Sequence, residues 1–227
     1  MLRRRRGKLG SGHPRYVAPA AQLMATTRVF LLSPAYCGGR RATMLLRPGA
    51  DFQMAKELEA GMLTLGAAFS FMSGLYFRGK LTYAQTFGRR PAPAATLIIT
   101  PTRGLQKPDT PVTAAILREF AAGEVDVNDG RYRAALERDA LALSRRLDAG
   151  ARVVLLGSVA TGKYVDILSP LLGDRLCYPA SFIGRGDMSR GGLLLRSAAA
   201  GMELEYVAIQ AGVRPRGRRP PKLGPRP

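Results

Sequence analysis

The segment of this chain closest to a recognised chemical motif is residues 157–163, GSVATGK, which fits the spacing G-x-x-x-x-G-K. In a P-loop this spacing lets backbone N–H groups cradle a phosphate while the lysine reaches its oxygens. Tyr164 stands where a P-loop would offer Ser or Thr to magnesium. The segment therefore predicts a phosphate-binding turn, and a degenerate P-loop nucleotide-binding enzyme is the less favoured alternative. Its candidate ligand-binding residues are Ser158, Thr161, Gly162 and Lys163.

Three further segments combine glycine, a small hydroxyl or thiol side chain, and arginine. They are residues 34–41 (PAYCGGRR), 101–105 (PTRGL) and 181–192 (SFIGRGDMSRGG), each following a predicted strand. Ligands of open α/β sheets bind beyond the carboxyl ends of the strands, so four cationic loops there predict an anionic ligand such as a phosphate or nucleotide. The alternative is that a basic protein has arginine in most of its loops. The candidate binding residues in these loops are Arg40, Arg41, Arg103, Gly104, Arg185 and Arg190.

Acid–base chemistry in the folded part must use groups other than imidazole, because His13 is the only histidine and lies in the N-terminal tail. This excludes Ser-His-Asp and Cys-His catalysis in their usual forms, and nearly every histidine-ligated metal site. Asp187 is the preferred catalytic carboxylate, and Asp109 is the second candidate. Asp187 is equally well explained as a cap for the helix that follows it, or as a partner of Arg190.

Two other features have a possible chemical role. Cys37 lies near Arg40 and Arg41, and neighbouring cations lower the pKa of a thiol and make it nucleophilic. A single cysteine in a Gly-rich loop is, however, more often inert. Residues 73–80 (SGLYFRGK) put aromatic side chains beside cations, which suits base stacking and phosphate contact. Tyr76 is the candidate there, although its helical spacing also favours a place in the core.

The framework that would position these loops is predicted from short apolar runs. Residues 28–33 (RVFLLS), 96–100 (TLIIT) and 152–157 (RVVLLG) are typical of buried parallel strands. Residues 175–178 (RLCY) predict a fourth strand, and residues 203–209 (ELEYVAI) an edge strand. Since helical segments lie between them, we expect an α/β fold of three layers. Its mostly parallel central sheet would have about four to five strands, with helices on both faces.

Apolar residues at helical spacing fill the intervals between these strands. Asp51 is the expected cap of the first clear helix, and residues 65–87 predict a helix interrupted at 73–74. The pair Thr110-Pro111 predicts another helix start, since proline favours the first helical position. Residues 131–148 have the clearest apolar stripe.

Positive charge is concentrated at both ends of the chain. The chain has 35 Lys and Arg against 16 Asp and Glu, a net charge of +19. Residues 1–23 and 213–227 have no acidic residue and are rich in Arg, Gly and Pro, which predicts disordered tails around a single α/β domain of residues 24–212. The tails are either solvated appendages or a means of holding nucleic acid. We expect translation to start at Met24, with residues 1–23 an extension.

The compartment is predicted from what the sequence lacks. No run of about 18 apolar residues is present, so no transmembrane segment is expected. The first residues lack the apolar centre of a signal peptide. Cys37 and Cys177 are the only cysteines, too few for a disulfide framework or a zinc site. A cytoplasmic protein without a bound metal is the expectation, and no cofactor is indicated.

Three landmarks in order, LLSPAYCGG (31–39), GLYFRGKLTYA (74–84) and TLIITPTRGLQKPD (96–109), carry a resemblance to known proteins. The chain resembles a group of poorly characterised bacterial α/β proteins over about residues 28–165, and its LLSPA start is similar to the peroxide-stress protein family. The resemblance implies a three-layer fold like that of uracil-DNA glycosylases and a role near nucleic acid or nucleobases. The positions that it favours for the site are Ser33, Cys37, Tyr76, Gly104 and Asp109.

Together these patterns predict a nucleic-acid-associated or nucleobase- or nucleotide-processing protein. In it, a phosphate-bearing ligand would lie at the carboxyl edge of the sheet, held by cations from the four loops. The cations expected to bind the phosphate are Arg40, Arg103, Lys163 and Arg185. The alternative of a different class is a non-enzymatic nucleic-acid-binding module that uses its basic tails. Whether the protein is an enzyme is left open by the sequence.

Overall fold

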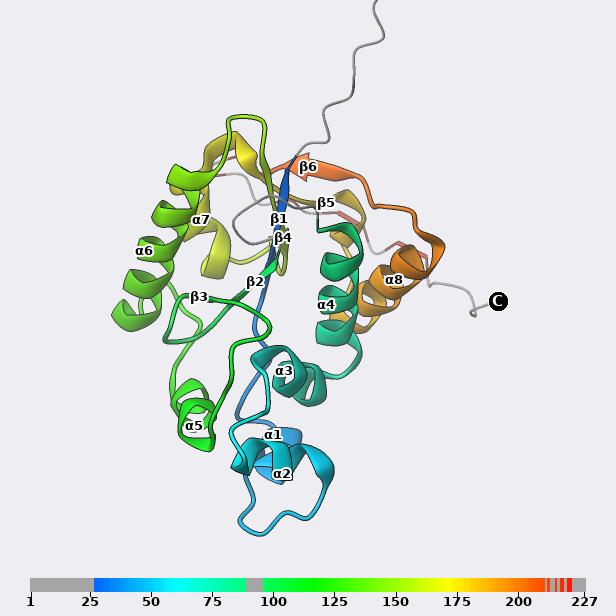
Figure 1. Ribbon diagram of the computed structural model, residues 1–227. Coiled ribbons are helices and arrows are strands. Elements are labelled where there is room, and N and C mark those ends of the chain that lie inside the picture. Colours follow the sequence, from blue (N-terminus) through cyan, green and yellow to red (C-terminus); the bar gives the residue numbers. More distant parts are fainter. Residues whose placement is uncertain are drawn as a thin grey trace, which may run out of the picture.

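The computed structural model describes residues 27–88 and 96–210, together with positions 212, 215, 217, 218, 220 and 221. The described strands form one sheet in the order β3-β2-β1-β4-β5-β6. The four inner strands run parallel to one another, and β3 and β6 pair antiparallel at the two edges. Helices lie on both sides of this sheet (Figure 1). The fold is thus α/β with a mixed, mostly parallel sheet.

The predicted strands are present with small changes at their ends. They are β1 (Arg28–Leu32), β2 (Thr96–Ile99), β4 (Arg152–Leu156), β5 (Leu176–Pro179) and the edge strand β6 (Tyr206–Ala208). The sheet has one strand more than expected, β3 (Leu105–Gln106). Two residues are too few to show a period in the sequence. They become a strand because the chain turns back at Gly104, whose φ is +63°, and pairs with β2.

The described helices fill the connections. After β1 come α1 (Arg40–Leu45), α2 (Gln53–Glu59), α3 (Leu65–Ser73) and α4 (Leu75–Phe87). After β3 come α5 (Ala114–Ala122) and α6 (Gly130–Arg146), and after β4 comes α7 (Gly162–Leu172). Two short 3-10 helices, η1 (Gly173–Arg175) and η2 (Ala180–Phe182), flank β5, and α8 (Asp187–Ala200) precedes β6. No helix in the described ranges is long and apolar enough to cross a membrane.

Two predicted helix starts are wrong, and each has a local cause. The helix expected at Thr110-Pro111 begins later, at Ala114, where the Thr113 hydroxyl accepts a hydrogen bond from the Ile116 N–H. Residues 110–111 instead run beside the start of α3, with the Leu65 N–H donating to the Thr110 carbonyl at 2.8 Å. Asp51 does not cap α2.

The residue at the N-cap of α2 is Phe52, and Asp51 forms an exposed ion pair with Lys56 instead. By contrast, the interruption predicted within residues 65–87 is confirmed. It falls at Gly74, whose φ of +61° ends α3 and begins α4.

Alternate residues of the inner strands pack into two separate cores. Phe30 and Leu32 face one side, which α3, α4, α5 and α8 cover. Val29 and Leu31 face the other side, which α6 and α7 cover. Figure 1 shows α6 and α7 on one side of the sheet and α4 and α8 on the other. This period-two burial is what a sheet covered on both faces requires.

The connections leave β1 and β4 in opposite directions. The chain after β1 passes to the side of α3 and α4, whereas the chain after β4 enters α7 on the other side. β1 and β4 are neighbours, paired from Arg28 with Arg152 to Leu32 with Leu156. Their carboxyl ends therefore form a topological switch point, the place where doubly wound sheets leave a crevice for a ligand.

The two basic tails predicted at residues 1–23 and 213–227, and the expected start at Met24, lie outside the described residues apart from five positions in the second tail. The prediction of one domain over residues 24–212 stays a prediction.

Candidate functional site

A cavity of about 620 Å³ lies at this switch point. Its volume is within the range of about 300–1,000 Å³ that small-molecule sites occupy. The segments after β1, β2 and β4 all contribute to the wall, as do α4, α8 and the connection from α5 to α6. The lining residues are Ser33, Pro34, Ala35, Tyr36, Cys37, Ser73, Tyr76, Pro101, Phe120, Gly123, Glu124, Val125, Asp126, Ser158, Thr161, Lys163, Tyr164 and Asp187.

Ser33 lies at the floor of the cavity, directly after β1. Its N–H continues the strand ladder by donating to the Leu156 carbonyl at 3.2 Å. A Cβ added at the neighbouring Gly157 would stand 3.1 Å from the Ser33 Cβ, so a larger residue there would have to push the two strand ends slightly apart. The hydroxyl of Ser33 therefore sits between the ends of two strands that the sheet holds in register.

Lys80 is the most deeply buried charged side chain in the described part of the chain, with 1% of its surface exposed. It projects from α4 towards the end of β1, where its Nζ lies 2.6 Å from the Ser33 carbonyl oxygen and 2.8 Å from the Ser33 Oγ. The rings of Tyr76 and Phe77 lie 4.4 and 4.9 Å from the same nitrogen. Lys80 is not part of the cavity wall; Ser33 separates it from the cavity.

Burial lowers the pKa of Lys80 to about 7, because the apolar interior disfavours the ammonium form. Two charges on α8 act in opposite directions and change this little. Asp187 raises the pKa of Lys80 and Arg190 lowers it. Near neutral pH the side chain is therefore shared between an ammonium ion and a free amine.

Two buried tyrosines flank Ser33 at the cavity. Tyr164, the first buried residue of α7, shares a hydrogen bond with the Ser33 side chain, and burial raises its pKa. The Tyr76 hydroxyl lies near the Arg190 guanidinium but meets hydrogen-bond geometry with no group in the described ranges. Burial raises the pKa of Tyr76 to about 12, so this buried hydroxyl stays neutral, while the residue lines the cavity.

The P-loop-like segment forms another wall of the cavity. Thr161 is the N-cap of α7, yet its side chain makes no capping hydrogen bond, so the first N–H groups of α7 are left for other acceptors. Ser158, Thr161 and Lys163 all line the cavity, and Lys163 is exposed. Tyr164 turns inward to Ser33 rather than standing where a P-loop residue would hold magnesium.

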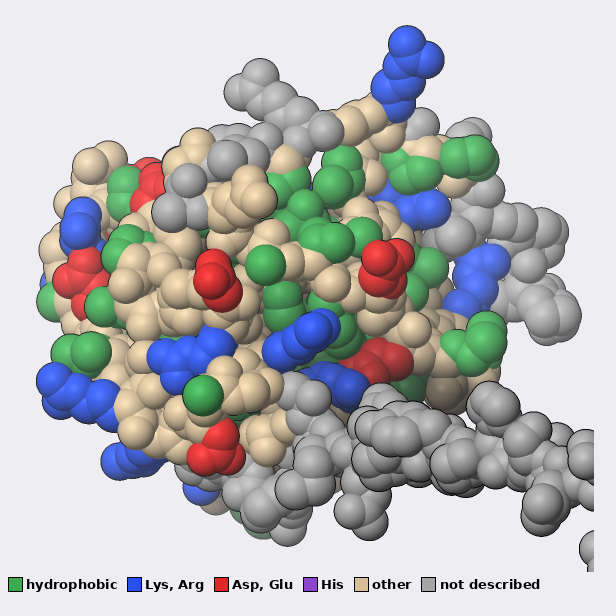
Figure 2. Space-filling view, turned by 90° about the horizontal axis from the view of Figure 1, so that it is seen from above, with side chains coloured by type: hydrophobic (Ala, Val, Ile, Leu, Met, Phe, Trp, Pro, Cys, Tyr) green, Lys and Arg blue, Asp and Glu red, His purple; other side chains and the backbone are tan. Residues whose placement is uncertain are grey.

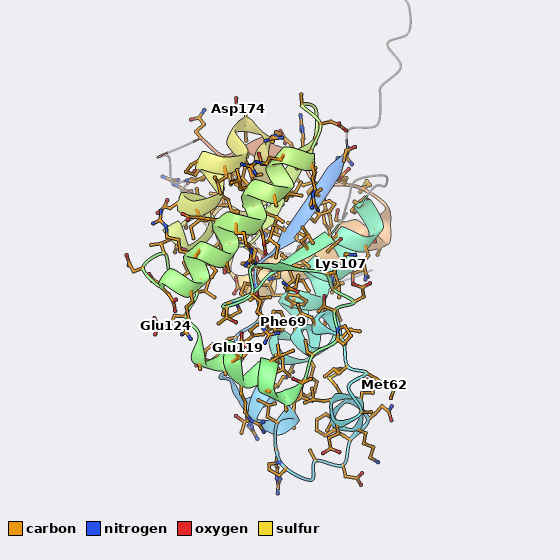
Figure 3. All side chains as sticks on the ribbon, turned by 60° about the vertical axis from the view of Figure 1, so that its left-hand side comes forward. Met62, Phe69, Lys107, Glu119, Glu124 and Asp174 are labelled. Carbon is orange, nitrogen blue, oxygen red and sulfur yellow. The ribbon has the colours of Figure 1, made fainter. Side chains whose placement is uncertain are left out.

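Three carboxylates also line the cavity. Glu124 and Asp126 come from the connection between α5 and α6, and Figure 3 shows Glu124 close to the start of α6. Asp187 begins α8 and lies 3.7 Å from the Arg190 guanidinium, with most of its side chain exposed. Among the described residues that line the cavity, Lys163 is the only cation, so this wall is more acidic than the sequence predicts.

Of the predicted site residues, seven lie in this wall and the others lie elsewhere. The seven are Ser33, Cys37, Tyr76, Ser158, Thr161, Lys163 and Asp187. Gly162 is the first residue of α7, directly beside them. Four of the remaining arginines, Arg41, Arg103, Arg185 and Arg190, bind other groups of the protein, and Arg40 is exposed outside the wall. The four loops therefore do not bring four cations together in the cavity.

Arg103 forms an ion pair with Glu119, with Nη2 and Oε2 2.6 Å apart, and Thr102 also donates to that carboxylate. These hydrogen bonds lower the pKa of Glu119 to about 2. Gly104 forms the turn into β3, and the N–H of Leu105 after it donates to Asp139 at 2.9 Å. Figure 3 places Glu119 on α5. These residues hold the loop after β2 in place.

The other predicted residues lie on helices or on the surface. Arg41 donates to the Phe71 carbonyl, whereas Arg40 and Asp109 are exposed. Arg185 donates to the Ser181 carbonyl at 3.0 Å and to the Ser189 hydroxyl at 3.2 Å. Both bonds stay within the segment that leads into α8.

Arg190 is buried, and it donates to the Phe182 carbonyl at 3.1 and 3.2 Å. Its guanidinium also lies 5.3 Å from the Phe182 ring. This arginine fixes the loop before α8 and, with Asp187, sets the charge around Lys80.

Cys37 lies in the wall but is only 4% exposed, and burial raises its pKa to about 12. The arginines that were expected to lower this pKa point elsewhere, so desolvation decides it. At neutral pH Cys37 is therefore a thiol, which is a weak nucleophile.

The sequence reasoning did not single out Lys80, Glu124 or Asp126. A signal for Lys80 was present, because it occupies the same helical face as Tyr76, Phe77 and Tyr83, all buried. A lysine at a core position of an amphipathic helix is unusual and indicates a partner in the interior. No comparable pattern marks Glu124 or Asp126. Within the described residues no group of three His, Cys, Asp or Glu side chains could hold a metal ion.

Comparisons with known proteins add no family to this description: no protein-family model matches the chain, and neither a curated protein nor a solved structure is significantly similar to it. The resemblance to the uracil-DNA-glycosylase-like group stays a prediction.

Proposed function

We propose that the cavity binds a nucleoside or nucleoside monophosphate, and that the protein processes nucleotides or nucleobases. The observation that carries this proposal is the cavity at the switch point between β1 and β4, which an exposed Lys163 at the start of α7 lines together with carboxylates from another connection. Doubly wound sheets bind nucleotides at this position.

The composition of the wall suits each part of such a ligand. Lys163 and the N–H groups at the start of α7 suit one phosphate group. Carboxylates such as Glu124 and Asp126 accept hydrogen bonds from ribose hydroxyls or from the amino group of a base. Phe120, Pro34 and Pro101 offer apolar surface for the ring.

The balance of charge argues against a polyphosphate. One lysine against three carboxylates would leave the several negative charges of a nucleoside triphosphate without partners. The P-loop alternative is also weakened, because Tyr164 is 7% exposed and hydrogen-bonded to Ser33.

The nucleic-acid-binding module remains an alternative that depends on the tails. On the face shown in Figure 2, Lys and Arg side chains are interspersed with Asp and Glu rather than gathered into one basic patch. Binding of nucleic acid through its phosphates, without regard to base sequence, needs such a patch or the tails.

The proposal is tested by isothermal titration calorimetry of the full chain. The ligands are adenosine, AMP, ATP and inorganic phosphate, followed by the cytidine, guanosine and uridine series. We expect one nucleoside monophosphate to bind more tightly than its triphosphate. Lys163→Ala should weaken monophosphate binding by about tenfold, the value of one charge-assisted hydrogen bond, and leave nucleoside binding unchanged.

Arg145→Ala is the matched control, because Arg145 is exposed at the far end of α6. Asp126→Asn should weaken the nucleoside and the monophosphate equally. If no compound in the series binds, or if Lys163→Ala and Arg145→Ala behave alike, the proposal is wrong.

A further inference from the structure

We propose that Ser33 is a nucleophile for carboxylic esters and that Lys80 acts through it as the base. The proposal rests on the contact between the two side chains and on their places relative to the cavity. It goes beyond ligand binding, and it rests on the proposed function only for the identity of the alcohol half of the ester.

The two side chains divide the roles of an activated nucleophile. Ser33 lies in the cavity wall. Lys80 Nζ lies behind it, 2.8 Å from the Ser33 Oγ and outside the cavity. A nucleophile within hydrogen-bond distance of a base, with that base held by a third group, is the arrangement that covalent catalysis needs.

The third group is the Ser33 carbonyl, which accepts a hydrogen bond from Nζ at 2.6 Å. A neutral amine has two N–H groups and one lone pair. When it donates to this carbonyl, its lone pair can point to Oγ and accept the hydroxyl proton. The Ser33 hydroxyl has two alternative acceptors, the Leu156 carbonyl at the longer distance of 3.3 Å and the Tyr164 hydroxyl.

The free amine is accessible near neutral pH. The groups that face Nζ are Ser33 on β1, the Tyr76 and Phe77 rings on α4, and Asp187 and Arg190 on α8. The rings favour the ammonium, but burial outweighs them and lowers the pKa of Lys80 to about 7. The charges of Asp187 and Arg190 oppose each other.

Groups that stabilise developing negative charge are also close. Attack on an ester places negative charge on its carbonyl oxygen, and preorganised N–H or O–H donors lower the barrier to that step. The first turn of α7 borders the cavity without a side-chain cap, so its N–H groups are the donors placed for this role.

The reaction needs an ester and water as reactants. Lys80 Nζ takes the proton of Ser33 Oγ as the oxygen bonds to the ester carbonyl carbon. The bond from that carbon to the alcohol oxygen then breaks, and the leaving alkoxide takes a proton from water, which becomes hydroxide, while Lys80 keeps the proton of Ser33. In the second half, that hydroxide attacks the acyl-Ser33 carbonyl. The bond from the acyl carbon to Ser33 Oγ breaks, the acid leaves, and the Lys80 ammonium returns its proton to Ser33 Oγ.

The substrate class is a carboxylic ester of a small acyl group. An O-acylated nucleoside satisfies both halves of the site, since the wall proposed for ribose and base would hold the alcohol part beside Ser33. Only the alcohol part of the ester depends on the proposed nucleoside site.

Labelling with a fluorophosphonate, a reagent specific for activated serine, tests the nucleophile without any nucleoside. We expect the full-length protein to gain one phosphonyl group, located on Ser33 by peptide mass spectrometry, and Ser33→Ala to gain none. Ser70→Ala is the matched control and should be labelled like the wild type, because Ser70 lies on α3 and is not among the residues that line the cavity. Labelling at Ser158, or no labelling at all, overturns the proposal.

The role of Lys80 is tested by the pH profile. In the wild-type protein the labelling rate should rise with pH through a midpoint of about 7, as the ammonium loses its proton. Lys80→Met should reduce the rate at pH 8 by about 100-fold or more and abolish this midpoint. If Lys80→Met does not fold, the wild-type profile decides alone: a rate without a midpoint between pH 6 and 8 contradicts the role.

The two proposals fail separately. If Ser33 is labelled but no nucleotide binds, Ser33 and Lys80 keep their proposed roles and the nucleoside is rejected as the ligand. If nucleotides bind but Ser33 is not labelled, the cavity is a nucleotide-binding site and Ser33 is not a nucleophile. Release of acid from an O-acetyl nucleoside, lost in Ser33→Ala, is the expected result when both hold.

Discussion

Gly79 of α4 and Gly191 of α8 lie in direct backbone contact. A Cβ added at Gly79 would stand 2.7 Å from the Gly191 carbonyl oxygen, and one at Gly191 would stand 2.8 Å from the Leu75 carbonyl oxygen. The two helices therefore approach more closely than any side chain permits. This contact places Lys80 on one helix beside the charges of Asp187 and Arg190 on the other.

Gly191→Ala should destabilise the protein by about 1–3 kcal/mol, since the added methyl group meets backbone on α4 and forces the two helices apart. Urea denaturation of the purified variant measures this. Gly130→Ala is the control, because a Cβ at Gly130 meets nothing within 4 Å in the first turn of α6. Equal stability of the two variants would show that α4 and α8 tolerate separation.

The stability of the protein should depend on pH through Lys80. Its pKa is about 7 in the folded chain against an ordinary value of 10.5, so between these values the unfolded chain binds a proton that the folded chain does not. The free energy of unfolding therefore gains about 1.4 kcal/mol per pH unit from this group as pH rises above 7.

Lys80→Met removes this contribution. The stability of the variant relative to the wild type should be greater at pH 6 than at pH 9, measured by urea denaturation at both. The difference in stability between the variant and the wild type is taken at each pH. The contributions of the tyrosines and cysteines then cancel, because these groups titrate alike in the two proteins. A constant difference across this range would mean that Lys80 keeps its charge in the folded state.

Cys37 should react slowly with thiol reagents in the folded protein. It is 4% exposed and its pKa is raised to about 12 by burial, so almost no thiolate is present at pH 8. Labelling with 5,5′-dithiobis(2-nitrobenzoic acid) in buffer and in urea, followed by peptide mapping, measures this. Cys177 is buried too and provides an internal reference. Rapid labelling of Cys37 alone in buffer would restore it as a nucleophile.

Gly104→Ala should destabilise the protein more than Gly173→Ala. Both glycines have positive φ, +63° and +54°, so both substitutions strain the backbone. A Cβ at Gly104 also collides with Asp139, which accepts the Leu105 N–H, whereas one at Gly173 meets nothing within 4 Å. We expect about 1 kcal/mol for Gly173→Ala and several times that for Gly104→Ala. Thermal unfolding of the two variants side by side gives the comparison, and equal losses would assign the whole effect to φ.

The sequence by itself determined the inner sheet and the edge at which the site lies. The apolar runs at 28–33, 96–100 and 152–157 predict β1, β2 and β4, because strands covered on both faces must be apolar throughout. The carboxyl ends of parallel strands share one edge, so the segments after β1 and β4 meet there whatever the helices do. Lys163 and Asp187 were predicted in this way and lie in the cavity wall, whereas Ser33, which also lies there, was predicted from the resemblance.

Only the tertiary structure decided which polar side chains face the cavity and in what state of charge. Arg103 was predicted to bind phosphate, but Glu119, sixteen residues later, holds it. The surroundings of Lys80 come from α4, α8 and the end of β1, and their combined burial is a property of three distant segments packed together. Ion pairing and desolvation depend on distance in space, which the spacing of residues along the chain does not give.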